Sequence, residues 1–341
     1  MRSRLVASIA MTLALAACSG DANPTTTAAT VSTTTVSTTA VTSTAVTTTV
    51  VTTTAGPLSS TTSADDGFPV TVETPAGPVT VDERPAAVVS LSASATEMLF
   101  ALGAGDQVVA TDEFSDYPPE APTTELSGIT PNLESIASYG TDLVIASFDP
   151  DDMAAGLAAL GIPVLIQDAA VEIDDVYAQI EQLGAVTGNG ESAGRLVAAM
   201  RADVAEVVAE LPQGAGGLTY YHELDDQLFT VTSATFIGQV YDLLGLVNIA
   251  DAADQEGAGY IQLSEEYLIE ADPDLIFLAD TRCCSQSAAT VAERPGWNTM
   301  QAVVTGAIVE LDDDVASRWG PRIVDFLQAV GVAVAEVVEL S

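Results

Sequence analysis

The 341-residue sequence contains no lysine, and its nine basic residues are all arginines, set against 48 aspartates and glutamates. The formal net charge is −39 at pH 7. Nucleic-acid phosphates and anionic lipid headgroups would repel a chain this acidic. We therefore exclude nucleic acid and anionic lipid surfaces as binding partners.

Residues that ligate metals are also scarce, because the sequence holds one histidine, His222, and three cysteines. This scarcity argues against a zinc or manganese site built from several histidines, and we predict neither a resident metal nor a cofactor. Two of the cysteines, Cys283 and Cys284, are adjacent, and consecutive α-carbons (~3.8 Å apart) are closer than a disulfide prefers. A vicinal disulfide or a place at the edge of a ligand site remains one alternative, and two buried free thiols the other.

The N-terminal segment has the features of an export signal. An apolar run over residues 5–17 follows Arg2 and Arg4 and is too short to span a bilayer. Small residues before Cys18 are typical of a bacterial lipoprotein signal. We expect a signal peptide over 1–17, lipidation of Cys18, and an exported protein anchored to the outer face of the cytoplasmic membrane. An ordinary secretory signal is the alternative.

Residues 18–66 consist largely of threonine, valine and alanine. Such low complexity cannot specify a core, so we predict an extended stalk in which the lipid-bearing cysteine is the first residue. The Val/Thr alternation leaves a strand as the formal alternative.

The remaining residues alternate short apolar runs with amphipathic segments, which predicts parallel sheets covered by helices on both faces. The longest helical pattern, over 187–212, separates an N-terminal α/β lobe at 67–186 from a C-terminal α/β lobe at 213–341. We predict an α/β fold of two Rossmann-like lobes joined by one long rigid helix, with a ligand cleft between them. Ser94 and Glu97 fit a capping box at the start of one helix.

The two lobes share a sequence repeat. The segments PNLESIASYGTDLVI and LSEEYLIEADPDLIF superpose when Asp142 is placed on Asp274, and this alignment also places Glu134 on Glu266. Both glutamates are expected in the first turn of a short helix, where the helix dipole favours an acid. They are either plain helix-terminus charges or a pair of equivalent acids presented to a two-fold partner.

From about Asp82 onward the chain resembles the solute-binding lipoproteins of iron-siderophore and cobalamin ABC importers. The resemblance is carried by four segments: RPAAVVSLSASATEMLFALGAGDQVVATDEFSDYPPEA, TPNLESIASYGTDLVIAS, TSATFIGQVYDLLGLVNIA and ASRWGPRIV. It implies a monomer that captures cobalamin, a ferric siderophore or haem and delivers it to a permease and ATPase. It further implies that Glu134 and Glu266 dock onto arginines of the permease.

The resemblance also implies ligand-binding residues. Phe114, before Ser-Asp-Tyr-Pro-Pro, and Tyr260, six residues before the C-lobe glutamate, match aromatics that contact the ligand in the cobalamin binders. Asp314 matches an acidic ligand position, although a solvated turn is its alternative. Arg318, Arg282 and Arg322 of the C-terminal lobe are candidates for binding ligand carboxylates. Arg322, at an expected helix start, is alternatively a brace of the fold. Aromatic residues more often fill cores, so that alternative stays open.

Tyr221 is a further ligand-binding candidate, because it lies in the segment Tyr220–Glu223 at the end of a predicted strand. Open α/β sheets bind their ligands at this carboxyl edge.

Two other classes of protein are alternatives to a transport function. An enzyme is disfavoured because the sequence shows no phosphate-binding loop, no G-x-S-x-G elbow and no metal-ligand spacing. We therefore predict no catalytic residue. A surface adhesin or wall-associated lipoprotein would explain the threonine-rich stalk, but it would not explain the paired glutamates.

Overall fold

The computed structural model describes residues 67–340, so the predicted signal peptide, Cys18 and the stalk lie outside the described residues. The first half of the described chain contains these elements: β1 Val70–Val72, β2 Val79–Val81, β3 Val88–Leu91, α1 Ala93–Ala101, β4 Val108–Thr111, α2 Leu133–Ser138, β5 Leu143–Ala146, α3 Met153–Ala158, β6 Val164–Ile166 and α4 Ile173–Thr187. The helix α5, Gly190–Glu210, follows directly.

The second half contains these elements: β7 Thr219–Glu223, β8 Phe229–Val231, α6 Phe236–Asp242, β9 Val247–Asn248, β10 Tyr260–Gln262, α7 Glu265–Ala271, β11 Leu275–Leu278, α8 Ala288–Ala292, α9 Gln301–Thr305, β12 Ile308–Glu310, α10 Asp313–Ser317 and α11 Ile323–Leu340. Short 3-10 helices lie at Gly105–Gln107, Pro150–Asp152, Ile249–Ala252 and Trp297–Thr299.

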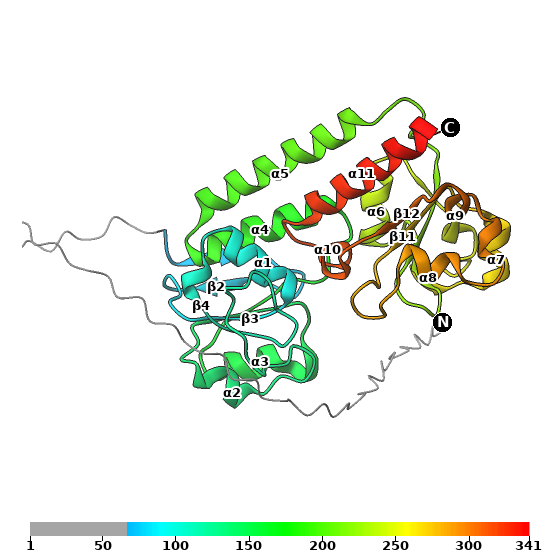
Figure 1. The fold of residues 1–341 in the computed structure, drawn as a ribbon. Helices are drawn as coiled ribbons and strands as arrows, with labels where there is room; N and C mark the ends of the chain where they lie inside the picture. The colour runs from blue at the N-terminus through cyan, green and yellow to red at the C-terminus, as the bar shows by residue number, and fades with distance from the viewer. Residues whose placement is uncertain (1–66, 341) are drawn as a thin grey trace, which may run out of the picture. The chain divides into compact units, whose positions relative to one another are not determined.

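Each lobe is built around one four-stranded parallel sheet (Figure 1). The strand order is β4-β3-β5-β6 in the N-terminal lobe and β12-β11-β7-β9 in the C-terminal lobe. The antiparallel pairs β1-β2 and β8-β10 stand outside these sheets. The predicted α/β class with two parallel-sheet lobes is confirmed.

The sequence repeat is also a repeat of strand pairing. Val88 in β3 pairs with Leu143 in β5, and an offset of 132 residues carries this pair onto Tyr220 in β7 and Leu275 in β11, which also pair. The central strands of the two sheets therefore share one register, as the superposition of Asp142 on Asp274 predicts.

The two repeat aspartates explain why this register is kept. The Asp142 carboxylate accepts hydrogen bonds from the backbone amides of Ala86 (2.8 Å) and Ala87 (3.0 Å), immediately before β3. The Asp274 carboxylate accepts from the amide of Thr219 at 2.7 Å and from its hydroxyl at 2.8 Å, at the start of β7. Asp142 directly precedes β5, and Asp274 directly precedes β11. In each lobe the aspartate therefore ties the start of the first repeat strand, β3 or β7, to the start of the second, β5 or β11.

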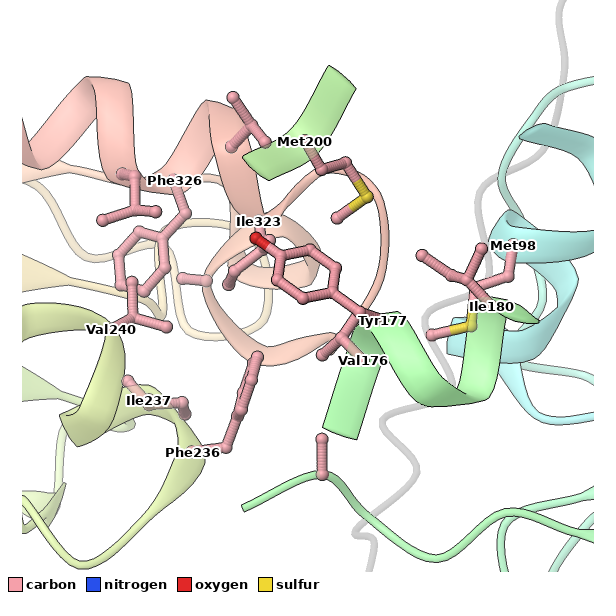
Figure 2. Packing of buried hydrophobic residues seen from close by; sticks show 14 of the residues in the cluster. Met98, Val176, Tyr177, Ile180, Met200, Phe236, Ile237, Val240, Ile323 and Phe326 are labelled. Atoms are coloured by element: carbon pink, nitrogen blue, oxygen red, sulfur yellow. The ribbon is translucent and has the colours of Figure 1, made fainter. Parts of the chain in front are cut away.

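The apolar interior has three parts. Separate clusters cover one face of each sheet, around Ile136 and Leu157 in the N-terminal lobe and around Trp297 and Leu268 in the C-terminal lobe. The third and largest cluster includes residues of both lobes, and side chains of α1, α4, α5, α6 and α11 meet in it (Figure 2). Separating the lobes would expose this shared core to water, so it holds them together.

The helix α5 lies at the predicted place and packs against both α4 and α11 (Figure 1). On its inner face Met200 is buried, and Leu196, Val204 and Val207 pack against the shared core. The long helix therefore contributes to the shared core together with its neighbours α4 and α11.

The predicted capping box at Ser94 and Glu97 is wrong. The N-cap of α1 is Ser92, whose hydroxyl accepts a hydrogen bond from the Ala95 amide, while Ser94 lies inside the helix. The carboxylate of Glu97 instead binds two arginines of the C-terminal lobe.

Among the described residues, no helix is long and apolar enough to cross a membrane.

Candidate functional site

Three loops that follow carboxyl ends of sheet strands meet one another. The loop 112–118 follows β4, the loop 279–287 follows β11, and the segment 311–322 follows β12 and includes α10. The first belongs to the N-terminal lobe and the other two to the C-terminal lobe. Ion pairs of Arg282 and Arg318 with Asp116 join these loops across the lobes. Carboxyl edges of parallel sheets are the usual place for a ligand.

The loop 112–118 presents Phe114, whose side chain is 49% exposed. A chain of buried hydroxyls fixes the loop from below: Ser90 accepts from Thr96, Thr96 bonds Ser115 at 2.9 Å, and Ser115 donates to Asp112 at 2.6 Å. Burial raises the pKa of Asp112 above its ordinary value, against the opposing effect of the Ser115 hydrogen bond. Phe114 is thus an exposed aromatic on a backbone held by buried polar groups.

Arg318 reaches this loop from the C-terminal lobe. Its Nη2 donates to the carbonyl oxygen of Phe114 at 3.0 Å and to Asp116 Oδ1 at 2.9 Å. Its side chain is 12% exposed and also pairs with Asp314 at 2.8 Å. Burial would raise the pKa of Asp116, but the hydrogen bond and charge of Arg318 outweigh it and lower that pKa. Three residues predicted for the ligand site, Phe114, Asp314 and Arg318, are therefore brought together.

A buried carboxylate completes the network. Glu97 in α1 has a side chain only 2% exposed, and it accepts from Arg318 Nη1 at 3.0 Å. Arg322 binds the same carboxylate through Nε (2.8 Å) and Nη2 (2.5 Å), and its guanidinium lies 4.1 Å from the centre of the Tyr117 ring. Arg322 braces the fold at the start of α11, which was one of the roles weighed for it.

Sequence reasoning missed the role of Glu97. A signal existed, because Glu97 is the single acid in the apolar helix segment SASATEMLFAL of a chain with few arginines. A buried carboxylate requires a charged or hydrogen-bonding partner, and here the two arginines that flank Trp319 and Gly320 supply it.

Arg282 and Asp314 lie at the exposed side of the same network. Arg282 is exposed and bonds Asp314 at 2.5 Å, with Asp312 at 3.6 Å. Asp314 lies in the first turn of α10 with a 24% exposed side chain. The neighbouring Asp313 accepts hydrogen bonds from the backbone amides of Arg282 and Cys283, which holds the loop against α10.

The thiols of Cys283 and Cys284 are free, with their sulfur atoms 2.7 Å apart. Cys283 is exposed and Cys284 is half-buried, so the alternative of two buried thiols is wrong as regards burial. Burial of its sulfur, and then the neighbouring thiol, raise the pKa of the Cys283 thiol.

Tyr260 lies in β10, opposite Val231 in β8, and is 58% exposed. None of the hydrogen bonds or ion pairs among residues 67–340 connects its side chain to the loop that carries Phe114.

Tyr221 has a different environment from that predicted. It is 1% exposed, and its ring packs against Trp297 at 6.3 Å between centroids. The reason is topological, since β7 is an interior strand between β11 and β9 with both faces covered. In this conformation its side chain has no surface to offer a ligand.

The later residues of β7, His222 and Glu223, are equally buried. His222 donates to or accepts from the Tyr241 hydroxyl at 2.8 Å, and burial lowers the pKa of His222 to about 3. Glu223 forms a two-point ion pair with Arg294, with both distances 2.6 Å. The carboxyl end of β7 is therefore part of the buried core and offers no surface to a ligand.

The two repeat glutamates occupy matching places. Glu134 is the second residue of α2 and Glu266 the second residue of α7. Both are exposed, and neither forms an ion pair within the described residues. The caps match as well, because Asn132 accepts from the Ser135 amide and Ser264 from the Tyr267 amide.

A pocket of about 410 Å³ opens beside the Glu97 network and is lined in part by Phe100, Tyr117 and Arg322. Of the residues weighed for ligand binding, Arg322 alone lines it, and Phe114, Tyr221, Tyr260, Asp314 and Arg318 do not.

Two parallel-sheet lobes related by a repeat, with loops from both meeting at the carboxyl edges, define a two-lobe binding-protein fold. A family model described as periplasmic binding protein matches residues 88–315. The chain belongs to the periplasmic binding protein family.

Individual relatives agree with this assignment. The chain is 29% identical to the uncharacterized ABC transporter substrate-binding lipoprotein YvrC of Bacillus subtilis, over 78% of this chain and 86% of the relative. It is 32% identical to a cobalamin-binding protein of Halobacterium salinarum, over 72% of this chain and 69% of the relative. The crystal structure of the periplasmic vitamin B12 binding protein of Vibrio cholerae is similar at 26% identity and a TM-score of 0.64, with 75% of this chain and 99% of that chain covered.

Proposed function

We propose that this chain is the extracytoplasmic substrate-binding subunit of an ABC importer and that it captures a corrinoid of the cobalamin type. The observation that carries the proposal is the exposed ring of Phe114 on a braced loop at the carboxyl edge of a sheet, where the two lobes meet. The names of the relatives from Halobacterium and Vibrio, each a cobalamin or vitamin B12 binder, support the same ligand class.

In this proposal Phe114 and Tyr260 supply apolar walls for a large planar ligand. Exposed aromatic rings contribute both buried area and stacking to such contacts. Asp314 and the exposed Arg282 stand at the edge of the same region and can bind amide or carboxylate groups. Tyr221 is omitted from the proposed contacts because its side chain is buried.

Binding measurements test this proposal directly. The full-length chain, purified in detergent, is titrated with cyanocobalamin, haemin and a ferric hydroxamate siderophore by calorimetry and native mass spectrometry. We expect one cyanocobalamin per chain, and we expect Phe114→Ala and Tyr260→Ala each to weaken binding about tenfold. Saturable binding of haemin or the siderophore alone would contradict the corrinoid and retain the importer class. Binding of none of the three would contradict both.

A substrate-binding subunit must also dock on a permease and be held near the membrane that contains it. We propose a monomer, lipidated on Cys18, that docks on its permease through Glu134 and Glu266, one acid from each lobe. Their equivalent places in α2 and α7 support this docking. Replacing Cys18 with serine should shift the full-length chain from the membrane fraction to the soluble fraction, and unchanged retention would contradict the anchor. The proposed role is binding, without a catalytic step.

A further inference from the structure

We infer that Arg318 is a positioning residue for ligand binding: from the C-terminal lobe it fixes the loop that presents Phe114 in the N-terminal lobe. The inference rests on the proposed function, because it takes the exposed ring of Phe114 as a ligand contact. It replaces the direct ligand contact that the sequence predicts for Arg318.

Two nitrogens of the Arg318 guanidinium bind oxygens of the protein. Nη1 donates to Glu97 at 3.0 Å, and Nη2 lies within hydrogen-bond distance of three oxygens. These belong to the Phe114 carbonyl (3.0 Å), Asp116 (2.9 Å) and Asp314 (2.8 Å). With its side chain 12% exposed and four protein oxygens around Nη1 and Nη2, Arg318 presents little surface to a ligand carboxylate.

The contacts fall on the residues around the exposed ring. Arg318 binds the carbonyl of Phe114 itself and the carboxylate of Asp116, and the intervening Ser115 is held by the buried Thr96 and Asp112. Three consecutive residues are therefore fixed, while the Phe114 ring remains 49% exposed. Binding to a ring that is already positioned costs less conformational entropy than binding that must first order the loop.

Lysine cannot replace this arginine. The planar guanidinium presents donors in a fixed fork, whereas an ammonium is a compact point charge at the end of a flexible stem. Arg318→Lys keeps the positive charge but cannot reach Glu97, Asp116 and the Phe114 carbonyl together. The variant therefore isolates positioning from charge.

Arg322 offers a matched control within the same network. It shares the Glu97 carboxylate with Arg318, but its guanidinium lies over the Tyr117 ring and forms none of the described hydrogen bonds with Phe114. Arg322→Lys should weaken the brace at α11 and leave the contact between Arg318 and the Phe114 carbonyl in place.

A double-mutant cycle tests the inference. The dissociation constant for cyanocobalamin is measured for the unaltered chain, Arg318→Lys, Phe114→Ala and the double variant; haemin is the probe if the unaltered chain binds only haemin. We expect Arg318→Lys to weaken binding about five- to tenfold in the Phe114 background and less than twofold in the Phe114→Ala background. Arg322→Lys should change affinity less than twofold.

Amide hydrogen exchange gives a readout that needs no ligand. A peptide covering residues 112–118 should exchange faster in Arg318→Lys than in Arg322→Lys, because only the first variant releases the loop.

Equal losses of affinity in the two Phe114 backgrounds would overturn the inference and restore direct ligand contact by Arg318. Unchanged affinity in Arg318→Lys, or unchanged exchange of the loop, would overturn it as well. If the unaltered chain binds only the siderophore, that ligand is the probe for the same cycle. A chain that binds none of the three ligands contradicts the proposed function and therefore this inference. If the unaltered chain binds the ligand normally and the losses of affinity from Arg318→Lys and Phe114→Ala add, the inference is contradicted and the proposed function is not.

Discussion

Among single residues, Glu223 and Asp280 show how a buried acid depends on its partners. Both are 0% exposed at the carboxyl ends of β7 and β11. Glu223 has two hydrogen bonds from Arg294, whereas Asp280 forms no ion pair within the described chain and lies beside the Glu223 carboxylate. Burial, and then the negative charge of Glu223, raise the pKa of Asp280 to about 7.

This raised pKa predicts a specific pH dependence of stability. Between about pH 4 and pH 7 the folded chain keeps a proton on Asp280 that the unfolded chain releases, so the free energy of unfolding falls as pH rises through this window. Asp280→Asn carries no charge and should be about 1–2 kcal/mol more stable than the unaltered chain at pH 8, with little difference at pH 4. Urea denaturation at both pH values measures this.

The matched control is Asp226→Asn, which changes an exposed acid in the loop between β7 and β8. It should show no such change in relative stability between the two pH values. His222, whose lowered pKa destabilises the fold as pH falls below about 6.5, is present in every variant and cancels from the comparison. An Asp280→Asn chain with the same pH dependence as the unaltered chain would contradict the buried, uncharged acid.

At the scale of elements, the repeat aspartates decide how the two sheets begin. At the start of the first repeat strand, Asp142 binds two backbone amides and Asp274 binds the amide and the hydroxyl of Thr219, each through a single carboxylate oxygen. Removing either acceptor leaves these amides without their partner, at a cost of about 1–3 kcal/mol.

We therefore expect Asp142→Ala and Asp274→Ala to lower the free energy of unfolding by similar amounts, about 1–3 kcal/mol each. Asp142→Asn and Asp274→Asn should lose less, because an amide oxygen can accept the same hydrogen bonds without the charge. Urea denaturation of the four variants measures these differences. Alanine variants that match their asparagine counterparts would show that the hydrogen bonds do not stabilise the strands.

Many of the helices and strands, and the repeat that relates the two lobes, could be predicted because local sequence patterns specify them. The apolar run 88–91, the helical stripe along α5 and the glycines after α2 and α3 mark their elements within a few residues. The spacing of Glu134 and Asp142 repeats at Glu266 and Asp274 because it follows one helix-to-strand unit present twice. Information of this kind lies within about ten residues and is visible in the sequence.

Contacts between distant segments could not be predicted. Glu97 and Arg318 are 221 positions apart, and no periodicity links a helix acid of one lobe to an arginine of the other. The sequence makes Tyr221 a ligand candidate because it lies near the end of a predicted strand. Its burial follows from its place on an interior strand whose face is covered by Trp297 and its neighbours. Strand order depends on long-range packing, which the local pattern leaves open.

At the scale of the two lobes, the shared core limits the motion that binding can produce. Met98 of α1, Tyr177 of α4 and Phe326 of α11 belong to one apolar cluster that also includes residues of α6 (Figure 2). The buried Glu97 network adds charged contacts between the same two lobes. A large hinge opening would break both, so we expect ligand binding with little closure of the lobes. A nearly rigid spacing would also hold Glu134 and Glu266 at a constant separation.

A constant separation matters if the two acids dock together on a permease. We expect Glu134→Arg, Glu266→Arg and the double variant to bind cyanocobalamin normally and to fail in stimulating the permease–ATPase complex. Unpairing a partly buried permease arginine should cost about 2–5 kcal/mol for each acid, or at least thirtyfold in affinity for the complex. Ligand-dependent ATPase activity in reconstituted vesicles measures this, with Glu206→Arg/Glu210→Arg on the exposed side of α5 as the charge-matched control. Charge-reversed permease arginines should partly restore activity to the double variant, since opposite charges would again face each other. Full stimulation by the double variant would exclude docking through this pair and leave both glutamates as acids that stabilise the first turns of α2 and α7.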